Sequence, residues 1–202
     1  MLLDLCQLYA NEHDIIFNTS KTFCMMIVPI SLKIYEFPTV TLQNDMLQFV
    51  NEFCYLGHTL TSNMSSDTDI EQQRRKLCAR GNALIRNFRF CEVSTKIQLF
   101  SSYCSSIYGS SLWYNYTQEK TRRLRVCHND ILRNLMQVAR ANSATQLFII
   151  CNLRSLDVIR RISIFSLKNR IEKSNNGLLL TLKSSDAFVT FGLHNEWNSR
   201  LF

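Results

Sequence analysis

The chain has 202 residues, of which 46% are hydrophobic and 19% charged, with only five glycines and two prolines. This composition is typical of a globular protein and argues against a disordered chain, and the scarcity of glycine and proline argues against loop-rich sandwiches and barrels. The formal net charge of +7 and the pI of about 9.1 favour acidic partners, of which nucleic acid is the commonest. A basic surface that is simply solvated is the alternative.

Eight cysteines are scattered along the chain without any Cys-x-x-Cys pair. Most lie in apolar periodic segments, so free thiols and an intracellular setting, cytoplasmic or nuclear, are expected. Cys54 and His58 come nearest to a metal pair, but core positions explain them better than two zinc ligands without a second pair. There is no signal-peptide pattern, and no apolar run approaches the roughly 18 residues of a membrane span, so no membrane partner is expected.

Up to residue 62 the sequence predicts one helix and several short strands. Residues 1–11 place Leu2, Leu5, Cys6 and Tyr9 on one side of a helix. That helix begins without a cap, which suggests a chain cut within a larger fold. Alternating or apolar runs predict strands at 13–17, 22–28, 40–42 and 49–60, and the second of these is apolar enough to be buried.

After residue 66 the apolar period lengthens from two to about 3.6 residues. Helices are expected over 67–91, from a Ser94 cap onward, over 118–140, from Ser143 to about 151, and over 155–173. Residues 174–202 show no sustained period and are either a disordered tail or an unrelated extension. The prediction is therefore an α+β chain, mainly α, with a small sheet in 1–62, an all-helical region in 63–173 and a tail in 174–202.

Signatures of catalysis are mostly missing. The sequence has no glycine-rich phosphate loop, no Gly-x-Ser-x-Gly and no His-Glu-x-x-His. The close pair Asp67 and Asp69 stands at a helix start, where capping and the helix dipole explain both carboxylates without a metal. No metal site and no complete site for a small-molecule substrate are expected.

Two short stretches are candidates for contact with nucleic acid. Lys21 follows a turn and precedes a strand, where its ammonium could donate a proton to a leaving group or contact phosphate; an ordinary exposed lysine is an equally good interpretation. Tyr55, Leu56 and Gly57 join an aromatic ring to a glycine that permits close backbone approach. A hairpin strand with a core tyrosine is the favoured alternative for this stretch.

The helix expected from Asp67 carries the strongest candidate. Its apolar stripe consists of Ile70, Leu77, Leu84 and Phe88. The opposite face carries Arg75, Asn82, Arg86 and Arg89, which could contact phosphates. Intrahelical pairs of the neighbouring basic residues with Glu71 are the competing explanation. Gly81 lies on the apolar side, where close packing against another element would explain its cost in helix propensity.

Four blocks together resemble the reverse transcriptases of non-LTR (LINE-type) retrotransposons. They are IFNTSKT at 16–22, FCYLGHTLT at 53–61, DIEQQRRKLCARGNALIR at 69–86 and LFSSYCSSIY at 99–108. Their order and spacing match the stretch that follows the catalytic motif of that family. The resemblance extends over about residues 1–172, and the combination is far more specific than any single block.

The resemblance implies that residues 1–62 are the end of a polymerase palm and 63–173 a helical thumb with its continuation. Lys21 matches the lysine that assists pyrophosphate release in the family. The Tyr55–Gly57 stretch matches the primer grip, and the helix from Asp67 would follow the template–primer duplex. An RNA/DNA template–primer is thus the implied partner.

One departure from the family bears directly on activity. The family's aromatic-x-Asp-Asp turn would lie before residue 1, and this chain has no adjacent Asp-Asp pair. The intact family enzyme uses Mg²⁺, for which this chain has no such carboxylates, so no cofactor and no polymerase activity are expected from the chain alone. A separate nucleic-acid-binding helical module, or a non-functional remnant of a retroelement, are the alternatives.

Overall fold

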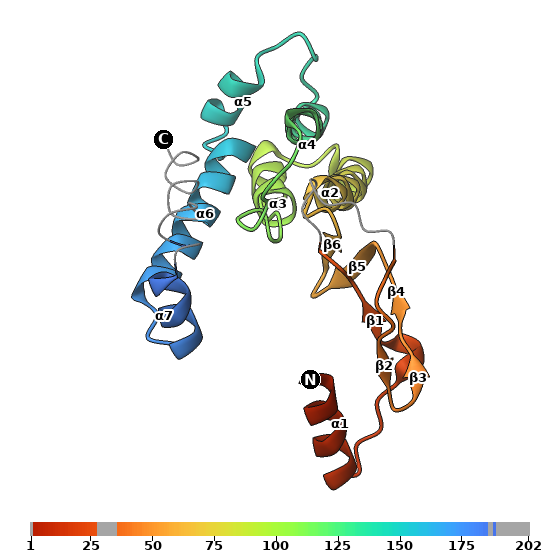
Figure 1. Cartoon of the computed structure of the whole chain (residues 1–202). Coiled ribbons are helices and arrows are strands. Elements are labelled where there is room, and N and C mark those ends of the chain that lie inside the picture. Colours follow the sequence, from red (N-terminus) through yellow and green to blue (C-terminus); the bar gives the residue numbers. More distant parts are fainter. Residues whose placement is uncertain (1, 28–35, 186–187, 189–202) are drawn as a thin grey trace. The chain divides into compact units, whose positions relative to one another are not determined.

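The structure is a computed structural model of the chain, and it describes residues 2–27, 36–185 and 188 (Figure 1). The chain separates into two compact units, residues 1–69 and 70–202. The described residues form seven α-helices and three two-stranded sheets. The fold is therefore mainly α with small strand pairs, as the α+β prediction requires.

Short elements make up the first unit. It contains α1 (Leu2–Glu12), the 3₁₀ turn η1 (Thr19–Lys21), β1 (Phe23–Cys24), β2 (Thr41–Leu42), β3 (Asp45–Met46), β4 (Gln48–Phe49), β5 (Glu52–Tyr55) and β6 (His58–Thr61). β1 pairs with β4 in parallel, whereas β2 with β3 and β5 with β6 form antiparallel pairs. The three pairs are separate two-stranded sheets and do not join into one.

Two of the strands predicted in this unit are wrong. Residues 13–17 form no strand, because the chain turns at His13 and Asp14, and Asp14 has a φ of 53°. The strand predicted at 22–28 is reduced to the two residues of β1, and its Phe23 is exposed rather than buried. β1 pairs with β4 alone, so it has no second neighbour to extend or cover it; Val28 lies outside the described residues.

The segment predicted as a continuous strand over 49–60 contains β4 and a hairpin. β5 and β6 pair from Glu52 with Thr61 to Tyr55 with His58, which leaves Leu56 and Gly57 as a two-residue turn. Both turn residues have positive φ, 48° and 81°. Such a turn matches the twist of the flanking strands, and Gly57 adopts this conformation without the steric cost that Leu56 bears.

The first unit buries few apolar side chains. Ala10, Leu42 and Leu47 are its buried hydrophobic residues among those described. Along α1, the predicted apolar side is largely exposed, with Leu2, Leu5 and Tyr9 more than half accessible. The helix predicted for residues 1–11 thus forms, but its apolar stripe has little to pack against within this unit.

Helices make up the second unit. They are α2 (Asp67–Phe88, which begins in the last residues of the first unit), α3 (Val93–Cys104), α4 (Gln118–Met136), α5 (Ala144–Ile150), α6 (Leu156–Lys173) and α7 (Gly177–Ser184). The predicted α2 stripe is confirmed: Ile70, Leu77 and Leu84 are buried in one cluster, and Phe88 packs against it. The same cluster holds Phe100 of α3, Leu124, Ile131 and Leu135 of α4, and Trp113 of the segment between them.

Several helix boundaries differ from the prediction. Glu92, not Ser94, is the N-cap of α3. α4 ends at Met136 instead of 140, because Gln137 adopts a left-handed conformation that stops the helix. Ser143 caps α5 as expected, its side chain accepting from the Gln146 amide. Residues 177–184, assigned to the structureless tail, form α7, whose N-cap is Asn176; 186–187 and 189–202 lie outside the described residues.

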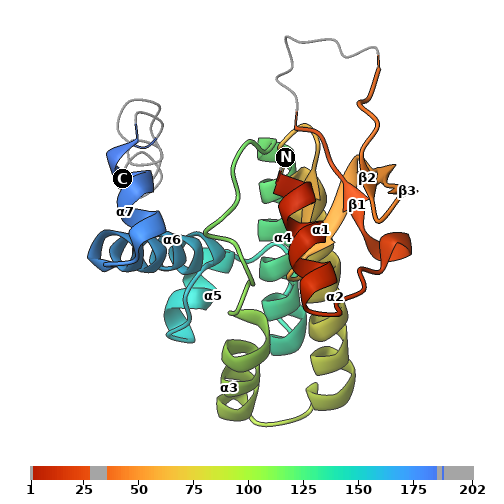
Figure 2. The same ribbon diagram turned by 60° about the horizontal axis from the view of Figure 1, so that its bottom comes forward.

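α2 and α4 approach each other most closely at Gly81. A Cβ atom placed on Gly81 would lie 2.5 Å from both Cγ1 and Cδ1 of Ile131. On either side of this point, Cys78 faces Cys127, and the Gln137 side chain donates to the Arg89 carbonyl. The offset between facing residues stays close to 49 throughout, so the two helices run in the same direction, as Figure 2 shows. The expected close packing of Gly81 is thus confirmed.

We predict that Gly81→Ala destabilises the protein although alanine is the better helix former. The gain of about 1 kcal/mol in propensity is outweighed by overpacking against Ile131, which typically costs about 1–3 kcal/mol. Urea unfolding of the variant should show the loss. Gly177→Ala is the matched control, since a Cβ there meets nothing within 4 Å. Equal stability changes for the two variants would contradict the prediction.

His128 of α4 is fully buried beside two aromatic rings. Its ring stacks on Phe148 at 5.3 Å between centroids and lies 5.0 Å from Phe100. Burial lowers the pKa of His128 from 6.5 to about 4, and the negative charge of Asp157 opposes this shift only in part. The imidazole is therefore neutral in the folded protein at neutral pH.

The pKa of His128 predicts a loss of stability in mild acid. The unfolded chain takes up a proton below pH 6.5 that the folded protein does not accept until about pH 4. The free energy of unfolding should thus fall by about 2 kcal/mol between pH 7 and pH 5. Urea titrations at the two pH values measure this, and His128→Leu should remove most of the difference. His13→Leu, at an exposed position, should leave it unchanged.

Candidate nucleic-acid interface

The first turn of α2 is tied to the β5–β6 hairpin through Asp69. This carboxylate is 3% exposed; Oδ1 accepts from the Thr59 amide at 3.1 Å, and Oδ2 lies 3.0 Å from His58 Nδ1. Asp69 lies in the first turn of α2, where the helix dipole favours a carboxylate, as expected. Its side chain also binds the hairpin, which the sequence does not indicate. The carboxylate thus has protein partners on both oxygens.

The side chains around Asp69 do not fit a Mg²⁺ site. Among the described residues there is no group of three or more histidine, cysteine, aspartate or glutamate side chains placed to hold a metal. Both oxygens of Asp69 are engaged by the hairpin. Nucleotidyl transfer needs carboxylates that bridge two cations. The described residues offer no such set of ligands, so no step through Mg²⁺ is assigned to this chain.

The Tyr55–Gly57 stretch is the tip of the hairpin. Tyr55 is 58% exposed and Leu56 71% exposed, so the alternative of a core tyrosine is wrong while its hairpin is confirmed. A protruding ring beside a glycine turn can reach a sugar or base without moving the backbone. The role of these residues remains a prediction.

Lys21 lies at the end of η1 and is exposed. Its backbone amide donates to the Asn18 carbonyl at 3.1 Å, which fixes the turn, and β1 follows two residues later. The predicted turn before a strand is confirmed in outline. The strand is too short and too exposed to hold the ammonium in a defined environment, so the geometry favours an ordinary surface lysine.

The predicted basic face of α2 lies on the surface of the second unit. Arg75, Asn82 and Arg86 are exposed, opposite the buried stripe. Arg89 is exposed as well, but it lies in a turn, because α2 ends at Phe88 and not at residue 91 as predicted. Arg86 and Arg89 form no ion pair with any residue that the structure describes. The Arg89 guanidinium lies 5.9 Å from the ring centroid of Phe90, which is itself 91% exposed. The C-terminal end of α2 thus combines two arginines with a fully accessible aromatic ring.

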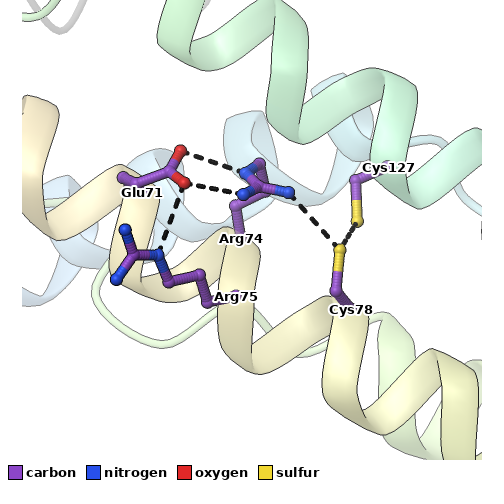
Figure 3. Close-up of polar contacts among 5 residues, drawn as sticks. All are labelled: Glu71, Arg74, Arg75, Cys78 and Cys127. Atoms are coloured by element: carbon purple, nitrogen blue, oxygen red, sulfur yellow. Dashed lines mark hydrogen bonds and ion pairs between the residues drawn. The ribbon is translucent and has the colours of Figure 1, made fainter.

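Near the N-terminal end of α2, arginine side chains form ion pairs with a carboxylate (Figure 3). Arg74 holds Glu71 through two hydrogen bonds of 3.0 and 2.6 Å, and Arg75 lies 3.5 Å from the same carboxylate. The bidentate Arg74 contact lowers the pKa of Glu71 to about 2. The intrahelical pairing with Glu71, expected of Arg74 and Lys76, is therefore confirmed for Arg74 and wrong for Lys76, which donates to Gln72 at 3.4 Å. Arg75 takes part instead, although its side chain stays 76% exposed.

A groove of about 490 Å³ runs between α2 and α4. Asn82 of the predicted face lines it, together with four arginines at 74, 122, 123 and 140. Three of these arginines are paired, with Glu71, Glu119 and Asp130 respectively. Arg123 is the one groove arginine that forms no ion pair with a carboxylate in the described part of the chain.

Sequence reasoning missed Arg123, Arg140 and Phe90. α4 carries basic residues at 120, 122, 123 and 125 near its start, and this cluster is a visible signal that was not used. The parallel alignment of α4 with α2, however, depends on the Gly81 contact and cannot be read from either helix alone. Phe90 follows the predicted helix face directly, and only its exposure marks it as distinct from a core residue.

Comparisons with protein-family models, with curated proteins and with solved structures found no match. Among the described residues, no helix combines the length and apolarity that crossing a membrane requires.

The contacts of Asp69 predict that Asp69→Ala loosens the hairpin. The Thr59 amide loses its charged acceptor, and a hydrogen bond to a charged group contributes about 2 kcal/mol. We expect lower stability in urea and a marked loss of hydrogen-exchange protection at the Thr59 amide. Glu52→Ala is the control, because the exposed Glu52 carboxylate accepts from the Thr68 hydroxyl at 3.4 Å only weakly. Unchanged protection at Thr59 in the Asp69 variant would contradict the role assigned here.

Proposed function

We propose that this chain is the template–primer-binding part of a protein related to non-LTR retrotransposon reverse transcriptases. It binds the sugar–phosphate backbone of an RNA–DNA duplex through the exposed face of α2. Arg86 and Arg89 are the main phosphate contacts, and Arg75 and Asn82 are secondary ones. The observation that carries the proposal is the exposure of Arg75, Asn82 and Arg86 on one face of α2 and of Arg89 just beyond its end, with Arg86 and Arg89 unengaged by carboxylates in the described structure.

The helix geometry supports backbone binding rather than base recognition. Residues 75, 82 and 86 follow steps of seven and four, so their side chains form a line along one side of α2, and Arg89 lies in the turn directly after the helix ends at Phe88. Cations in such a line meet successive phosphates and carry no sequence information. Exposed Phe90 at the end of the line offers a flat surface for stacking against a sugar or an unpaired base.

The first unit supports the partial-palm side of the proposal. Its three strand pairs and few buried residues leave apolar side chains of α1 and β1 accessible, as expected of elements that pack on further strands. The exposed Tyr55–Gly57 tip has the form required of a primer-positioning hairpin. Without paired carboxylates the chain binds and positions nucleic acid but performs no transfer step.

Charge reversal tests the proposal directly. A short fluorescein-labelled RNA–DNA duplex is titrated with the wild-type chain and with Arg86→Glu/Arg89→Glu, at several salt concentrations, by fluorescence anisotropy. The variant should bind at least about tenfold more weakly, and the slope of log K against log[salt] should fall in magnitude by about 2, one per lost phosphate contact.

The matched control is Arg161→Glu/Arg170→Glu, which makes the same change of net charge at two exposed positions of α6. It should retain a binding constant and salt slope close to those of the wild type. Equal weakening by the two double variants would show that only net charge matters, and unchanged binding by the α2 variant would refute the interface.

A further inference from the structure

We propose that Cys78 and Cys127 form a redox-active dithiol that closes to a reversible disulfide and links α2 covalently to α4. The oxidant class is a small peroxide, and the reductant a small dithiol. The two cysteines are 49 residues apart in sequence, and both are free thiols in this structure. The disulfide would form whether or not the chain binds nucleic acid.

The distance between the two sulfurs carries the inference. Sγ of Cys78 lies 2.7 Å from Sγ of Cys127, with the two side chains pointing toward each other across the helix pair (Figure 3). This is closer than non-bonded sulfurs normally come and only roughly 0.7 Å longer than a disulfide bond. Because the neighbouring Gly81–Ile131 contact holds the helices together, bond formation needs only a small local shift.

Oxidant can reach the pair. Both cysteines line the groove between α2 and α4, whose volume of about 490 Å³ is ample for hydrogen peroxide. Cys104 and Cys151, in contrast, are buried. Access and proximity thus coincide at this one pair among the contacts that the structure describes between cysteines.

The surroundings distinguish the two sulfurs. Arg74 Nη1 donates to Cys78 Sγ at 3.6 Å while its other nitrogens hold Glu71. Cys78 is thus the sulfur that a guanidinium contacts directly, and we assign it as the attacking sulfur. Burial raises the pKa of Cys127 to about 12, and its neighbour Cys78 adds to the effect. Cys127 therefore stays protonated and is the resolving thiol.

The chemistry balances with one peroxide. The Cys78 sulfur loses its proton and attacks a peroxide oxygen, the O–O bond breaks, and the leaving hydroxide takes up a proton as water, which leaves a sulfenic acid on Cys78. The Cys127 sulfur then attacks the Cys78 sulfur, the S–O bond breaks, and water leaves with the Cys127 proton. Two thiols and one hydrogen peroxide yield one disulfide and two waters, and a dithiol such as dithiothreitol reverses the step by exchange.

Peptide mapping of the full chain tests the proposal. The reduced protein is treated with one equivalent of hydrogen peroxide, alkylated and digested with trypsin. The main cross-link should join Leu77–Arg80 to Val126–Arg133, and dithiothreitol should release both peptides. Oxidation should raise the melting temperature by about 5–10 °C, because the bond closes a long loop.

Variants complete the test. Cys78→Ser should abolish the cross-link and the rise in melting temperature, while Cys54→Ser, at an exposed position of β5, should preserve both. Cys127→Ser serves in the same way if the first variant folds poorly. A main cross-link from Val126–Arg133 to the Cys104 peptide, or full alkylation of Cys78 and Cys127 after peroxide, would overturn the proposal.

Discussion

The close approach of α2 and α4 at Gly81 is the constraint on which the second unit depends. Ile131 occupies the space that a side chain at residue 81 would take, so the two helices pack with almost no gap at this level. Ile131 also lines the groove between the same two helices, together with the arginines and the two facing thiols. One glycine therefore sets both the packing of the core and the position of the polar surface above it.

Asp69 plays a comparable part at the start of α2. Its two oxygens bind His58 and the Thr59 amide, so the helix begins at a fixed point on the hairpin. A buried carboxylate is tolerated only when hydrogen bonds replace its hydration, and here both replacements come from one strand. The hairpin tip at Leu56 and Gly57 is thereby presented by a braced strand pair, although the rest of the first unit has a small core.

The helical half was largely predictable from the sequence and the strand half was not. The stripe from Ile70 to Leu84 repeats over about four turns, long enough for periodicity to determine both the helix and its buried face. The strands are two to four residues long, so two-residue alternation cannot separate them from turns. α4 ends because Gln137 adopts a left-handed conformation, which the sequence does not indicate. The exposed face of α2 could be predicted from the helical periodicity of its apolar residues. The groove could not, because it depends on which residues of α4 lie beside α2.

Net charge alone does not locate the proposed interface. Of the arginines on α2 and α4, those at 74, 122, 125 and 133 are held by carboxylates three or more residues away, and so is Arg140, which follows α4. An arginine already paired must give up that partner before it can bind a phosphate, which cancels much of the gain. Arg86 and Arg89 bear no such cost in the described structure, and they stand at the helix end where Phe90 is exposed. The end of α2, rather than the arginine-rich groove, is thus where a polyanion gains most from contact.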